Sequence, residues 1–143
     1  MLQLILLVVL FVGGGYAAVR GGAPERWGIG LFVMGAVLTN VTLAVAQAHY
    51  QRPVVGMMIV DVALAVAFTL LALKAQRFWP LWVAAAQIDM VAADVVIYSS
   101  ETTAWAYAIA LWALSIPPPV LIGLGAWRHR RRLNRFGSDP SWT

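Results

Sequence analysis

The chain has 143 residues, of which 62% are hydrophobic and 11% are charged, whereas roughly 25% of the residues in soluble domains are charged. This composition, with a mean hydropathy of +0.79, excludes the soluble globular class. Cysteine is absent, which excludes disulfides, thiolate metal sites and cysteine nucleophiles. The formal net charge of +4 is, in a membrane protein, first a signal of topology.

Five apolar stretches predict an all-α fold, a polytopic bundle of five transmembrane helices, because about 20 apolar residues cross the hydrocarbon core. No basic residue precedes the first stretch, which argues against a secretory signal. The fourth stretch follows Pro80, and proline suits a first helical turn. The spans are expected at residues 2–19, 28–48, 54–73, 81–98 and 104–127, with a basic cytoplasmic tail at 128–143.

The basic residues predict the orientation of these spans. Only Arg52 lies in a loop on one side, while the other nine fall on the opposite side, which is expected to be the cytoplasm. The amino terminus is therefore predicted outside and the carboxyl terminus inside. The preference for arginine over lysine, with abundant alanine and glycine, indicates a GC-rich bacterial genome and hence the bacterial cytoplasmic membrane. The nine residues are Arg20, Arg26, Lys74, Arg77, Arg128, Arg130, Arg131, Arg132 and Arg135.

Three carboxylates inside the predicted spans are the first candidates for a functional site, because a charge in hydrocarbon is costly and rarely lacks a partner or a role. Asp61 and Asp94 are expected in the outer half of the membrane, and Asp89 near its middle. Asp89 and Asp94 are five residues apart, about 140° around a helix, and cannot share a narrow face. Asp89 instead aligns with small residues at Ala85 and Ala92.

A polar cluster in the outer half follows from these positions. It is expected to unite Asn40, Gln47, Asp61 and Asp94, with Arg52 or His49 as the counter-charge. One interpretation is a set of interhelical hydrogen bonds that sets helix register, with one or more aspartates protonated. The other is a site for a proton, an ion or a ligand. The sequence leaves both open.

The fifth span contains Ser115 followed, after Ile116, by Pro117, Pro118 and Pro119. Three consecutive prolines remove three N–H donors, so the helix is expected to break or kink there. Interrupted helices form binding sites in transporters, but a kink that only shapes packing is commoner.

The remaining features favour no catalytic chemistry. The tail residues Arg128, Arg130, Arg131, Arg132 and Arg135 are expected to bind anionic lipid at the cytoplasmic surface, and nucleic-acid binding is not expected. The only histidines are His49 and His129, so neither a metal site nor another cofactor is predicted. No nucleophile with a neighbouring base is evident, and the chain is not expected to be an enzyme.

Two sequence stretches carry a resemblance to a family. The run Gly21 to Arg26, together with Arg77 to Trp82 and Gln87, resembles a group of small uncharacterised membrane proteins of alphaproteobacteria such as sphingomonads. The likeness covers most of the chain. The fourth span of that group tends to read W-P-L-W-x-A-G-F-Q and to carry Thr-His where this chain has Ala93 and Asp94. The resemblance implies a multi-span membrane protein and no particular activity.

Two functions are compatible with these observations. The first is a non-catalytic accessory or assembly subunit packed against a larger respiratory or photosynthetic membrane complex, or a homo-oligomer, through helix faces rich in small residues. The second is a small transporter, channel or proton-coupled carrier that uses the intramembrane aspartates. The identity of a partner or substrate, the oligomeric state and any bound pigment stay open.

Overall fold

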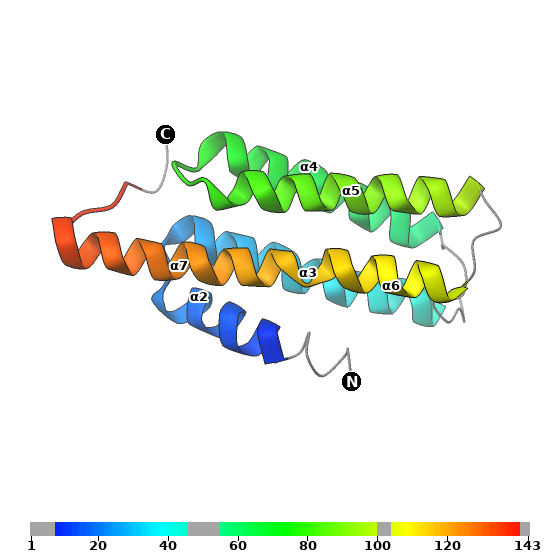
Figure 1. Ribbon diagram of the computed structural model, residues 1–143, viewed down its shortest axis with the longest axis horizontal. Coiled ribbons are helices and arrows are strands. Elements are labelled where there is room, and N and C mark those ends of the chain that lie inside the picture. The colour runs from blue at the N-terminus through cyan, green and yellow to red at the C-terminus, as the bar shows by residue number, and fades with distance from the viewer. Residues whose placement is uncertain (1–7, 46–54, 100–103, 141–143) are drawn as a thin grey trace.

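The computed structural model describes residues 8–45, 55–99 and 104–140, and the regular elements in this part of the chain are helices (Figure 1). Four of these helical stretches are long and apolar enough to cross a membrane: Ala23–Val45, Val55–Lys74, Trp79–Ser99 and Ile109–Phe136. The first predicted span, 2–19, lies partly outside the described residues. The elements are η1 (Leu10–Gly14, a π-helical turn), α2 (Gly15–Arg20), α3 (Ala23–Val45), α4 (Val55–Lys74), α5 (Trp79–Ser99), α6 (Ala104–Ser115) and α7 (Pro117–Phe136).

Local sequence explains where several helices begin. α3 starts at Ala23, five residues before the expected boundary, because Pro24 and Glu25 occupy its first turn, where proline needs no N–H partner and a carboxylate faces the positive helix end. α5 starts at Trp79 with Pro80 as its second residue, as the proline predicted. Both helices thus begin before the apolar runs that predicted them.

The helices form one bundle in which α4 packs between α3 and α5, and α7 packs against α3 and α5 (Figure 1). η1 and α2 lie against α7. The carboxyl ends of α2, α4 and α7 and the amino ends of α3 and α5 meet at one end of the bundle (Figure 1). We call this the basic end, because it collects all the Lys and Arg residues that the structure describes. Arg52 lies outside the described residues.

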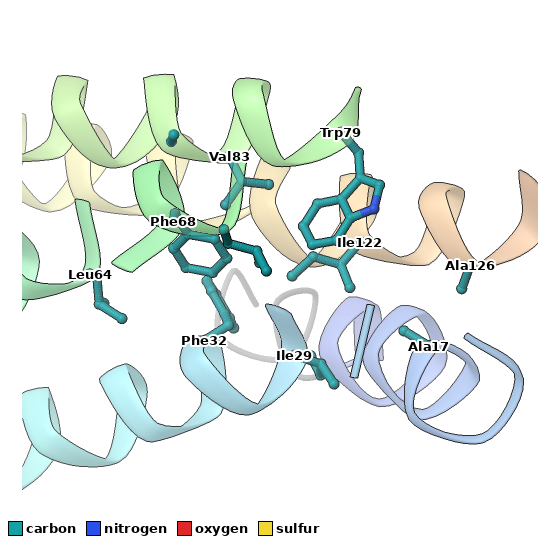
Figure 2. Close-up of a cluster of buried hydrophobic side chains, with 11 residues drawn as sticks. Ala17, Ile29, Phe32, Leu64, Phe68, Trp79, Val83, Ile122 and Ala126 are labelled. Carbon is teal, nitrogen blue, oxygen red and sulfur yellow. The ribbon is translucent and has the colours of Figure 1, made fainter. Parts of the chain in front are cut away.

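Trp79 is the largest side chain of the apolar core (Figure 2). Its indole is wedged between Gly28 of α3 and Gly125 of α7, and a Cβ atom at either glycine would collide with the ring. Phe32, Phe68 and Ile122 fill the neighbouring space (Figure 2). The glycines therefore allow three helices to meet on one aromatic ring.

The three prolines interrupt the last membrane helix without turning its axis. α6 ends at Ser115 and α7 begins at Pro117, as predicted, yet Ile116 keeps helical dihedral angles of φ −75° and ψ −43°. Figure 1 shows α7 continuing in the direction of α6. Ser115 Oγ donates to the Leu111 carbonyl at 2.6 Å. Prolines at the start of α7 need no N–H partner, so the helix can continue past them in the same direction.

The tail does not begin as a separate segment at the expected boundary, Trp127. α7 continues to Phe136, since arginine and leucine are good helix formers, and ends at Gly137. Gly137 has φ 71°, a left-handed conformation that favours glycine, and its N–H donates to the Leu133 carbonyl at 2.9 Å. This turn sends residues 138–140 back toward the bundle, where Asp139 and Pro140 reach Arg77.

Candidate functional site

The structure brings two of the predicted intramembrane carboxylates together. Asp61 lies on the buried face of α4 with Met57 and Leu64, and Asp94 lies on the buried face of α5 with Gln87 and Met90. Asp94 is 0% exposed and Asp61 is 8% exposed. The two carboxyl groups lie close enough to interact electrostatically.

Two acidic groups buried together among apolar helices are costly unless a proton or a partner neutralises them. Such a pair can bind and release a proton, and it can equally hold α4 and α5 in register.

The other members of the predicted cluster do not join this pair within the part of the chain that the structure describes. Asn40 is exposed on α3, where its amide nitrogen donates to the Ala36 carbonyl of its own helix at 2.8 Å. Gln47 and Arg52, as well as the alternative counter-charge His49, lie outside the described residues. Asp89 is exposed, in agreement with the predicted separation from Asp94.

A second polar group, which sequence reasoning missed, is buried at the basic end around Arg77. The Arg77 side chain is 2% exposed and that of Glu25 is 0% exposed. Arg77 Nε lies 3.3 Å from Glu25 Oε1, which also accepts from Trp79 Nε1 at 3.0 Å. The same carboxylate therefore holds the guanidinium and the indole that is wedged between α3 and α7.

The returning tail completes this group. Arg77 Nη2 lies 2.7 Å from Asp139 Oδ2, and Arg77 Nη1 donates to the Pro140 carbonyl at 2.6 Å. His129 Nδ1 lies 2.6 Å from Asp139 Oδ2, and Arg132 Nε lies 2.8 Å from Asp139 Oδ1. We call Glu25, Arg77, His129 and Asp139 the ionic cluster. It joins the start of α3, the α4–α5 connection, α7 and the tail.

The ionic cluster is a network of ion pairs built on one buried guanidinium. Its carboxylates already accept from Arg77, and no group of three His, Asp or Glu side chains suited to a metal ion occurs in the ranges 8–45, 55–99 and 104–140. One buried guanidinium binds two carboxylates from segments that are far apart in the sequence, and it thereby holds these segments together.

The exposed arginines form the outer surface of the basic end. Arg128, Arg131 and Arg135 are exposed and Arg130 is half-buried, while Arg132 is engaged by Asp139. The Arg131 guanidinium lies 5.5 Å from the centre of the Trp127 ring, within range of a cation–π contact. Arg128, Arg131 and Arg135 thus give the basic end an exposed positive surface.

Comparison of the chain with protein-family models, with curated proteins and with solved structures found no match.

Proposed function

We propose that this protein is a non-catalytic accessory or assembly subunit that packs sideways against a larger membrane complex, respiratory or photosynthetic, in the bacterial inner membrane. The observation that carries the proposal is the outward face of α5. Ala85, Ile88, Asp89 and Ala92 are all exposed there and share one helical stripe. We call these four residues the Asp89 face. A carboxyl group on a surface that meets lipid is unfavourable, and a second helix packed on this face would remove it from lipid.

The proposal is tested by photocrosslinking in the membranes of the source cell. A benzophenone amino acid at Ala92 is expected to crosslink to another protein chain, and the native complex should migrate well above the monomer on a native gel. The matched control is the same amino acid at Val37, which is 56% exposed on α3 and should meet lipid. A protein that migrates only as a free monomer and crosslinks from neither position would contradict an accessory role.

The Asp61–Asp94 pair supports a second candidate, a small proton-coupled carrier. Replacing either residue by asparagine removes one of the two acidic groups of the pair, so proton flux into proteoliposomes, followed with an internal pH dye, is expected to fall to the level of empty vesicles. Asp89→Asn is the matched control, because it removes an acid of α5 that faces away from the pair. Undiminished flux in Asp61→Asn and Asp94→Asn would leave the pair with a packing role only.

A further inference from the structure

The position of Asp89 identifies the chemistry of the helix that the Asp89 face would bind. Asp89 is the middle residue of α5, Trp79–Ser99, and at about 1.5 Å per residue it lies roughly 15 Å from either end. This depth corresponds to the centre of a hydrocarbon core about 30 Å thick. Water and lipid headgroups cannot reach that depth without deforming the bilayer.

Asp89 has no polar contact within the chain as described. None of the residues in 8–45, 55–99 and 104–140 forms a hydrogen bond or an ion pair with its carboxyl group. Asp94, one and a half turns away, points into the bundle and interacts with Asp61. The two acids of α5 therefore differ in their surroundings, and of the two only Asp89 lacks a polar partner among the residues that the structure describes.

The neighbours of Asp89 allow such a group to approach closely. Ala85 lies one turn before Asp89 and Ala92 one turn after it, and both are exposed. Small residues on a transmembrane helix let a second backbone come near. A short aspartate side chain between two alanines can then meet a longer side chain from the partner helix.

We infer that the Asp89 face binds a transmembrane helix of another protein that carries a lysine or arginine at mid-membrane. The inference rests on the proposed accessory function and names the chemistry of its partner. A cation complements a carboxylate in a medium where an unpaired charge is unfavourable. A second copy of this chain cannot supply that cation at this depth, because no lysine or arginine occurs in the middle of any candidate span.

A defined helix tests the inference without knowledge of the natural partner. The probes are leucine-based transmembrane peptides with lysine or leucine at the midpoint, reconstituted with the full chain in phosphatidylcholine vesicles. Because the chain has no cysteine, Ser138→Cys provides a unique position for a fluorescent donor, and the peptide carries the acceptor. We expect the lysine peptide to associate roughly tenfold more tightly than the leucine peptide.

Variants of Asp89 separate the charge from the shape of the face. Asp89→Asn is expected to abolish the preference for the lysine peptide, and Asp89→Glu to retain it. Equal binding of the two peptides to the native chain, or an unchanged preference in Asp89→Asn, would overturn the inference. Energy transfer between two copies of the chain that is lost in Asp89→Asn would also overturn it in favour of a homodimer. If Ala92 crosslinks to a partner while the lysine peptide shows no preference, the accessory function stands and the cationic partner is excluded.

Discussion

Arg77→Ala is expected to lower the free energy of unfolding by about 3–5 kcal/mol, the range for removing one partner of a buried ion pair. The guanidinium lies within 3.3 Å of Glu25 and 2.7 Å of Asp139. Its removal leaves two carboxylates of the ionic cluster without their buried cation. Because folded proteins are stable by only about 5–15 kcal/mol, much less folded protein should accumulate in the membrane. Unfolding by SDS in mixed micelles, followed by helix content, measures the change.

Arg135→Ala is the matched control, since Arg135 is exposed on the same end of the bundle and its loss should change stability by at most about 0.5 kcal/mol. Arg77→Lys keeps the charge but not the planar fork that meets several acceptors, and should fall between the two. It provides a measurable variant if Arg77→Ala does not fold. Equal stability of Arg77→Ala and Arg135→Ala would show that the ionic cluster contributes nothing to the fold.

Gly125→Ala is expected to destabilise the protein by about 1–3 kcal/mol, the usual effect of overpacking a filled core. A Cβ atom at Gly125 would stand 2.6 Å from Trp79 Nε1. The indole cannot move away, because Gly28 closes its other side and Nε1 donates to Glu25 at 3.0 Å. The same SDS titration, with tryptophan fluorescence as a second signal, measures the loss.

Gly30→Ala is the control for Gly28→Ala and Gly125→Ala, because a Cβ atom at Gly30 meets no atom within 4 Å. There alanine should be neutral or stabilise α3 by up to about 1 kcal/mol, since it favours helix more than glycine does. Gly28→Ala should resemble Gly125→Ala. If all three variants unfold alike, close approach to Trp79 does not limit the packing of the bundle.

The positions of the acids along α4 and α5 could be predicted from sequence, and so could their separation around α5. Helical geometry alone places Asp89 and Asp94 on different faces. It does not say which of the two residues points into the bundle. These helices are apolar around most of their circumference and have no polar side to mark the surface. The packing of α4 on α5 decided that Asp94 meets Asp61 and that Asp89 is exposed.

The ionic cluster could not be predicted in the same way. Glu25, His129 and Asp139 are separated from Arg77 by 52, 52 and 62 residues, and no spacing within one helix connects them. The distribution of basic residues along the sequence placed Arg77 and the tail arginines together on the cytoplasmic side and did not distinguish a buried arginine from exposed ones. The left-handed turn at Gly137 sends the tail back over the basic end and gives Arg77 its second carboxylate.

The sequence by itself determined the helical membrane class, the approximate limits of the described membrane helices and the gathering of basic residues at one end, because apolar run length and proline positions act locally along the chain. Only the tertiary structure decided which charges are buried together and which face outward. Those outcomes depend on the rotation of each helix about its axis, which is set by close packing, such as the Trp79 indole between two glycines. That rotation separates a buried acid, Asp94, from an exposed one, Asp89.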